Sequence, residues 1–228
     1  MIDKQVTDAR AAVADIPDGA TLFVGGFGPP GQPVQLIEAL LEQGAKDLVV
    51  INNNAGAGGE AISELFAAGR VRKVICSFPK AIGSTVFDEL YLAGKVELEL
   101  VPQGNLAERI RAAGAGIGGF YTRTGYGTEL AAGRETREFD GKGYVLELPL
   151  RADFALIKAH RGDPWGNLVY RKTARNFGPV MATAADVTIA EVDEIVPLGS
   201  LDPEVIITPG IYVDRLVGVG GPDRVEVP

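Results

Sequence analysis

The sequence has very little of the residue types that most often build metal centres and nucleophilic sites. Its 228 residues include one cysteine (Cys76), one histidine (His160) and one tryptophan. A zinc site with two or more histidines is therefore excluded, and a lone cysteine completes neither a thiolate cluster nor an internal disulfide. A Ser-His-Asp arrangement could use only His160. We expect no metal site in this chain.

The lone cysteine and histidine both lie in stretches that favour structural roles. Cys76 falls in the apolar, strand-like run 71–77, which favours a buried structural thiol over a reactive one. His160 ends the apolar run 154–160, just before the turn residues Gly162-Asp163-Pro164. We therefore interpret His160 as a strand-end histidine.

Clusters of positive charge and long apolar runs are also missing. No run of Lys or Arg exceeds two residues, and the formal net charge is −8, which disfavours nucleic-acid binding. No stretch reaches the roughly 18 apolar residues that span a membrane, and residues 1–5 have no apolar signal region. These absences predict a cytoplasmic protein that contacts neither nucleic acid nor membrane.

Apolar residues and glycines are abundant. Hydrophobic residues make up 46% of the chain, and a domain of this length can bury roughly 70% of its unfolded surface. The 30 glycines fall in predicted loops and after predicted helices, where glycine is the usual terminating residue. Because no linker or internal repeat is visible, we predict a single domain over residues 1–228.

Helix-like and strand-like segments alternate through the first half of the chain. A short amphipathic helix is expected within 1–17, followed by strand 21–24, helix 34–43, strand 47–51, helix 60–68, strand 71–77, helix 85–93, strand 96–101 and helix 105–113. This alternation predicts right-handed crossovers and a mostly parallel sheet.

The second half of the chain changes character. We expect a long glycine-rich loop at 114–128, a β-hairpin at 136–148, strand 154–160, helix 180–185, strand 187–192 and a strand-like tail at 206–213. The predicted fold class is therefore α/β: an open, mostly parallel sheet with flanking helices and an antiparallel addition.

The chain is organised around the first predicted strand and the loop after it. Four glycines and three prolines fall within residues 25–33, directly before a predicted helix. Glycines allow close approach of a ligand to the backbone, and free N–H groups at a helix start attract anions. A tight strand-to-helix turn without a ligand is the alternative. The loop has no lysine, which argues against a nucleoside triphosphate site.

Two further polar loops follow predicted strands. Residues 52–59 contain three asparagines and several glycines, and Gln103-Gly104-Asn105 follows the strand at 96–101. In an open α/β sheet, ligands bind beyond the carboxyl ends of the strands. Amide donors there suit a carbonyl or carboxylate that develops negative charge. Helix caps and turns are the alternative interpretation of the same residues.

Several motifs, taken together, resemble the family I CoA-transferases and span roughly residues 5–217. Gly25-Gly26-Phe27-Gly28 followed by Gly31-Gln32-Pro33 is similar to the family's first signature. The other matching stretches, in the same order as in the family, are 53–56, 101–111, 116–121, 124–128, 153–159 and 171–177. The chain resembles the α subunit of the two-subunit 3-oxoacid enzymes. Among these enzymes, those acting on 3-oxoadipate are more similar to it than those acting on acetoacetate in residues 101–106 and 163–168.

The resemblance implies covalent catalysis by a glutamate carboxylate that attacks the thioester of succinyl-CoA and becomes a glutamyl-CoA thioester. In the family this glutamate belongs to a Ser-Glu-Asn-Gly type motif of the β subunit. The Ser-Glu pair here, Ser63-Glu64, precedes Leu65 on an apolar-periodic helix, so Glu64 is interpreted as a solvated helix residue. The resemblance therefore implies a separate β subunit that carries the nucleophile, in an α2β2 heteromer.

The resemblance also implies roles for the polar loops. Gly25, Gly26, Phe27, Gly28, Pro29, Pro30 and Gly31 are expected near coenzyme A, and Asn53, Asn54 and Gln103 near the reacting oxygens. Arg123 and Lys172 are candidates for the cation that a dicarboxylic acceptor would need, although a surface charge is the simpler interpretation of each. The α subunit of a transferase that uses acetoacetate and succinyl-CoA, a CoA-ester hydrolase and a small-molecule sensor on the same scaffold remain as alternative functions.

Overall fold

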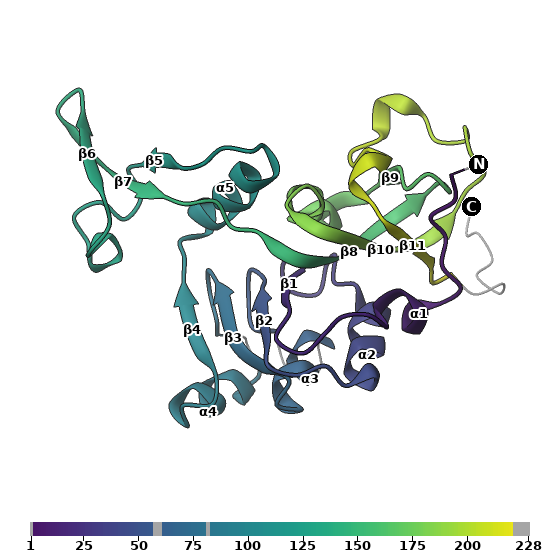
Figure 1. Cartoon of the computed structure of the whole chain (residues 1–228), viewed down its shortest axis with the longest axis horizontal. Coiled ribbons are helices and arrows are strands. Elements are labelled where there is room, and N and C mark those ends of the chain that lie inside the picture. Colours follow the sequence, from purple (N-terminus) through teal and green to yellow (C-terminus); the bar gives the residue numbers. More distant parts are fainter. Residues whose placement is uncertain (1, 57–60, 81–82, 221–228) are drawn as a thin grey trace.

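The computed structural model describes residues 2–56, 61–80 and 83–220. Within them an eight-stranded sheet runs in the order β11-β10-β8-β1-β2-β3-β4, with β9 beside β8 (Figure 1). Every pair along this path is parallel, and β9 is antiparallel to β8. The strands are β1 (Thr21–Val24), β2 (Leu48–Ile51), β3 (Val71–Cys76), β4 (Glu97–Leu100), β8 (Ala152–Gly162), β9 (Leu168–Val169), β10 (Ala185–Ile195) and β11 (Arg215–Gly218). The predicted mostly parallel sheet is confirmed.

Helices pack on both faces of this sheet. Side chains alternate along β1, so Leu22 and Val24 join one hydrophobic core and Phe23 joins the other. The first core includes residues of α1, α2, α3 and α4, and the second includes residues of α5 and α6. The helices are α1 (Ala9–Val13), α2 (Val34–Gln43), α3 (Ala61–Ala67), α4 (Val86–Leu92), α5 (Gln103–Gly114) and α6 (Gly178–Ala182).

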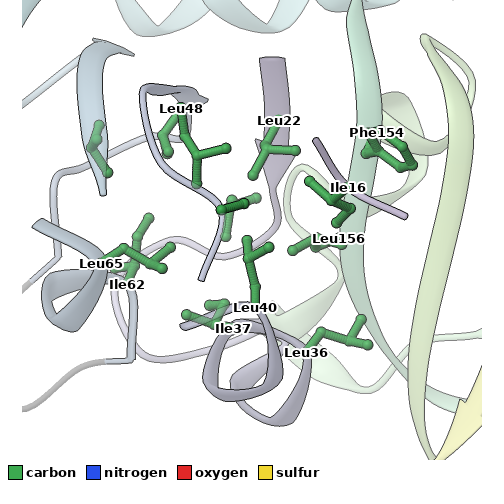
Figure 2. Packing of buried hydrophobic residues seen from close by; sticks show 14 of the residues in the cluster. Ile16, Leu22, Leu36, Ile37, Leu40, Leu48, Ile62, Leu65, Phe154 and Leu156 are labelled. Carbon is green, nitrogen blue, oxygen red and sulfur yellow. The ribbon is translucent and has the colours of Figure 1, made fainter. Parts of the chain in front are cut away.

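Helix α2 illustrates how the sequence pattern produces this packing. Leu36, Ile37 and Leu40 recur at helical spacing and are almost fully buried against the sheet (Figure 2). Gly44 ends the helix at φ 99°, where its N–H donates to the Leu40 carbonyl oxygen. Expected helix bounds in the first half agree with α2 to α5 within two residues, apart from the expected helix start at residue 60, which lies outside the described residues.

A three-stranded antiparallel sheet stands apart from the main sheet (Figure 1). Strands β6 (Thr136–Phe139) and β7 (Lys142–Glu147) form the predicted hairpin, joined by Asp140 (φ 51°) and Gly141 (φ 68°). β5 (Phe120–Thr122) pairs with the other edge of β7. The prediction of an unbroken loop at 114–128 was therefore wrong at β5, because its partner lies more than 20 residues further along the chain.

The C-terminal segment departs most from expectation. The predicted strand at 206–213 was wrong: Thr208 forms one isolated bridge with Leu168, and Gly210–Tyr212 is a 3₁₀ turn. The last strand of the described residues is instead β11, which pairs with β10. The N-terminal helix is also shorter than expected, and α6 begins and ends earlier in the chain than predicted. Among the described residues, no helix is both long enough and apolar enough to cross a membrane.

Candidate functional site

The carboxyl ends of β1, β2, β3 and β4 lie along one edge of the sheet, because these neighbouring strands are parallel. The glycine loop (residues 25–33) follows β1, Asn52 follows β2, Ser77 follows β3, and Gln103 comes shortly after β4. The topology therefore gathers the three predicted polar loops at one edge. Of the predicted loop 52–59, residues 57–59 lie outside the described residues.

Asn53, Asn54, Gln103 and Ser77 form a hydrogen-bonded group, here called the amide cluster. Asn53 Oδ1 accepts from Gln103 Nε2 at 2.9 Å and from Ser77 Oγ at 2.8 Å. Asn53 Nδ2 donates to Asn54 Oδ1 at 3.1 Å. The structure thus brings together the three predicted amide residues and adds Ser77, which sequence reasoning missed and which only its place after β3 could have indicated.

The side chains of the amide cluster range from fully buried to exposed. Asn53 is 1% exposed, Asn54 is half-buried, and Gln103 is exposed as the first residue of α5. The preceding residue, Pro102, provides no side-chain cap, so the positive end of the α5 dipole lies beside Gln103. Each side-chain amide has two N–H donors, and the bonds above use one from Gln103. The arrangement can present donors to an oxygen that gains negative charge.

Asn52 has a different role from its two neighbours. Its Nδ2 donates to the Val24 carbonyl oxygen at 2.6 Å, and its Oδ1 accepts from the Asn54 backbone N–H at 2.8 Å. The side chain is buried, and its two hydrogen bonds connect β1 with the turn after β2. The structural interpretation, a turn residue, fits Asn52, whereas Asn53 and Asn54 belong to the amide cluster.

The glycine loop is attached to the amide cluster. The Gly28 N–H donates to Asn54 Oδ1 at 3.2 Å. A Cβ on Gly28 would meet no atom within 4 Å, so this part of the loop has open space beside it. Phe27 in the loop and Phe78 after β3 are 49% and 61% exposed, and the Phe78 carbonyl oxygen accepts from Asn54 Nδ2 at 3.4 Å. Exposed aromatic surface therefore borders the polar cluster.

Two glycines are needed for the fold of the loop itself. Gly26 has φ 118° and Gly31 has φ 84°, and a Cβ on Gly31 would lie 2.6 Å from the Ala174 carbonyl oxygen. Asn176, which lies in the matching stretch 171–177 but has no role predicted from the sequence, holds the loop in place. Its Oδ1 accepts from Gly26 N–H at 3.2 Å and its Nδ2 donates to the Pro30 carbonyl oxygen at 2.9 Å. The loop is thus held in one shape from outside.

The sequence predicts that the N–H groups at the start of α2 are free to bind an external anion, but in the structure two of them already bond to a carboxylate of the same chain. Glu191, on β10, places Oε2 at 2.9 Å from the Gln35 N–H and at 3.1 Å from the Leu36 N–H. A carboxylate of the same chain therefore occupies the position where the sequence predicted an external anion. No local pattern in the sequence indicates this contact, because Glu191 lies 156 residues from Gln35.

The remaining candidates take structural or surface positions. Cys76 is fully buried, and burial raises the pKa of its thiol to about 12. His160 lies near the carboxyl end of β8, with Nδ1 at 3.1 Å from Asp193 Oδ2. Glu64 is exposed on α3, as expected. Arg123 and Lys172 are both exposed.

Comparison with known proteins gives one consistent result. The family model described as coenzyme A transferase matches residues 6–218. The α subunit of the 3-oxoadipate CoA-transferase of Pseudomonas putida is 63% identical over 221 residues, covering 97% of this chain and 96% of that protein. The α subunit of the succinyl-CoA:3-ketoacid coenzyme A transferase of Xanthomonas campestris is 56% identical, covering 97% and 91%.

Solved structures agree with the family model. An acyl-CoA transferase of Escherichia coli O157:H7 superposes with a TM-score of 0.83 at 26% identity over 99% of this chain. This chain spans about half of that protein, 48% of its length. The glutaconate coenzyme A-transferase of Acidaminococcus fermentans shares the fold, with a TM-score of 0.82 at 21% identity. With the family model spanning nearly the whole described chain, the protein is a member of the coenzyme A transferase family.

Proposed function

We propose that the chain is the α subunit of a two-subunit 3-oxoacid CoA-transferase that moves CoA from succinyl-CoA to a 3-oxoacid, with 3-oxoadipate as the preferred acceptor. Relatives from Pseudomonas putida and Acinetobacter baylyi that are named for 3-oxoadipate are 63% and 60% identical to it. Relatives named for succinyl-CoA:3-ketoacid transfer reach 56%. The higher identity supports 3-oxoadipate over a shorter 3-oxoacid.

The reaction needs a carboxylate nucleophile, which we assign to the β subunit. Its oxygen attacks the thioester carbonyl, the C–S bond breaks, and CoA leaves as a thiolate while the glutamate and succinate become joined as a mixed anhydride. The thiolate then attacks the enzyme's acyl carbon, releasing succinate and leaving a glutamyl-CoA thioester. The acceptor acid reverses these steps and departs as its CoA ester. Both ends of the exchange are thioesters, so no ATP is needed.

The amide cluster carries the proposal for this chain. Its side chains are amides and one hydroxyl and include no carboxylate, so it can donate to reacting oxygens without supplying the carboxylate nucleophile. Gln103 is exposed at the start of α5, and Asn53 fixes its amide by accepting a bond at 2.9 Å. We propose that Asn53, Asn54 and Gln103 stabilise negative charge on the thioester and carboxylate oxygens.

The glycine loop is proposed to contact the CoA ester. Phe27, Gly28, Pro29 and Pro30 are exposed or half-buried, whereas Gly25 and Gly26 are buried, so the proposed contact involves mainly the tip of the loop. Coenzyme A enters as a substrate thioester. A structure of the Escherichia coli relative is described as a thioester complex with CoA, which supports the same substrate class here. We further propose that residues 1–228 form one domain of an α2β2 heteromer.

The test is CoA transfer from succinyl-CoA, measured with this chain alone, with the isolated β subunit, and with the two chains mixed. We expect transfer only in the mixture, with a higher kcat/KM for 3-oxoadipate than for acetoacetate. Transfer by this chain alone would refute the assignment of the nucleophile to its partner. Preference for acetoacetate would reassign the acceptor, and CoA-ester hydrolysis without transfer would favour a hydrolase.

A further inference from the structure

We propose that Glu191 is a positioning residue that substitutes for an anionic ligand at the start of α2 and thereby fixes the glycine loop for the acyl-CoA. The inference rests on the proposed function, because it assigns the loop to the CoA ester. It adds a residue outside the predicted site, on a strand that the sequence motifs did not connect with the loop.

The contacts of Glu191 are those of a built-in helix cap. Its side chain is 3% exposed, and one oxygen accepts from two successive N–H groups, those of Gln35 at 2.9 Å and Leu36 at 3.1 Å. These N–H groups belong to the first turn of α2, where no residue of the helix itself can accept from them. A negative charge here also interacts favourably with the helix dipole. The preceding residue, Pro33, provides no side-chain cap of its own.

A cation on the neighbouring strand balances the buried carboxylate. Lys158 of β8 is in register with Glu191 of β10, and its Nζ lies 3.0 Å from Glu191 Oε1. The same Nζ lies 2.8 Å from Asp193 Oδ1, and Asp193 Oδ2 lies 3.1 Å from His160 Nδ1. A buried charge is costly without such a partner. The two strands therefore hold the carboxylate oriented toward α2.

The glycine loop is connected to these same strands at both ends. Gly25, at its start, donates from its N–H to the Leu156 carbonyl oxygen of β8 at 2.8 Å. Pro33, at its end, precedes the helix turn that Glu191 caps, and its carbonyl oxygen accepts from Ile37 N–H at 3.0 Å. Because α2 begins directly after the loop, a shift of its first turn would move the loop tip that is assigned above to the CoA ester.

The cap also restricts where the CoA phosphates can bind. Phosphate at the start of α2 would meet a buried carboxylate already bonded to the N–H groups of Gln35 and Leu36. Two negative charges on one pair of donors repel each other. The acyl-CoA must therefore use the loop tip and other donors, and its phosphates do not occupy this helix start.

The experiment compares Glu191→Ala and Glu191→Gln in the assembled two-subunit enzyme, with Glu194→Gln as the matched control. Glu194 is exposed on the same strand and takes no part in the contacts above. For Glu191→Ala we expect KM for succinyl-CoA to rise about tenfold, while KM for the 3-oxoacid changes less than about twofold. Glu191→Gln keeps an acceptor oxygen for both N–H groups, so its KM should rise only about twofold to threefold.

Two further readouts separate positioning from simple destabilisation. Hydrogen exchange at the Gln35 and Leu36 amides should quicken in Glu191→Ala while exchange in β1 stays slow. Calorimetric binding of CoA alone should weaken by a similar factor, and it does not depend on turnover. An unchanged KM and CoA affinity, or equal rises in KM for both substrates, would overturn the inference. If the wild-type pair shows no transfer but its CoA affinity falls in Glu191→Ala, the proposed function fails and the positioning role stands.

Discussion

Gln103 is the most exposed member of the amide cluster, so its substitution should affect catalysis more than stability. The side chain is exposed, and its one bond within the amide cluster is the 2.9 Å contact to Asn53. Removing an exposed amide leaves the hydrophobic cores intact, so stability should change little. Its removal takes away a donor that matters when negative charge develops in the transition state.

We therefore expect Gln103→Ala to lower kcat for CoA transfer by about 100-fold, with the melting temperature almost unchanged. Glu108→Gln, an exposed substitution on the same helix, is the control and should keep wild-type kcat. Steady-state kinetics of the assembled enzyme measure both. A Gln103→Ala enzyme with full kcat would show that this amide does not stabilise the reacting oxygens.

Cys76 provides a second prediction at the scale of one residue. The side chain is fully buried at the end of β3, and burial raises the pKa of its thiol to about 12. At pH 8 only about one thiol in ten thousand is then ionised, and the thiolate is the reactive form. We expect no labelling of the folded chain by a thiol reagent such as DTNB within minutes, and one equivalent after unfolding in urea. Rapid labelling of the folded protein would contradict this.

At the scale of elements, the glycine loop allows a matched comparison of two positive-φ glycines. Gly31 has φ 84°, and an added Cβ would lie 2.6 Å from the Ala174 carbonyl oxygen, a backbone atom. Gly28 has φ 62°, and an added Cβ would meet nothing within 4 Å. Both alanine variants strain the backbone, but only Gly31→Ala must also push the loop away from the neighbouring segment.

We expect Gly28→Ala to lower the free energy of unfolding by about 1 kcal/mol and Gly31→Ala by about 2–4 kcal/mol. Urea unfolding of the two variants beside wild type measures the difference. Activity provides the second contrast: Gly28→Ala, at the loop tip, should raise KM for succinyl-CoA despite its small effect on stability. Equal losses of stability would mean that the loop relaxes freely at Gly31.

The elements that could be predicted are those whose signals are local. Helix α2 has its apolar stripe, its proline start and its glycine end within a dozen residues, so its bounds follow from the sequence. β5 and β11 have no such signal, because β5 is three residues long inside a glycine-rich stretch and β11 is only four residues long. The three predicted amide residues lie close together because the carboxyl ends of neighbouring parallel strands lie at the same edge of the sheet. Glu191 and Asn176 could not be found this way, since each bonds to the loop region across about 150 residues.

At the scale of the whole molecule, ion pairs join segments that are far apart in the sequence. Asp15, just after α1, accepts from Arg215 of β11 at 2.5 and 2.6 Å, which connects the two ends of the described chain. The Arg215 hydrogen bond lowers the pKa of the Asp15 carboxyl. Burial tends to raise the pKa of Glu99, but hydrogen bonds from Lys73 and Arg109 outweigh it, so the pKa is lowered.

These shifts predict how stability depends on pH. Asp15, Glu99 and Asp193 all have a lowered pKa in the folded chain, and for Asp193 the bonds from Lys158 and His160 outweigh burial. A group with a lowered folded pKa binds more protons when unfolded, so its contribution to stability is complete above the unfolded pKa, about 4, and is lost as pH falls through the folded value. We therefore expect the free energy of unfolding to fall progressively below about pH 4, measured by urea unfolding from pH 7 to pH 3.

Arg215→Met removes the partner that lowers the Asp15 pKa, so this variant should be less stable at pH 7 and should lose less stability between pH 5 and pH 3 than wild type. A parallel pH dependence in the two proteins would show that the Asp15–Arg215 pair contributes nothing to the acid sensitivity of the fold.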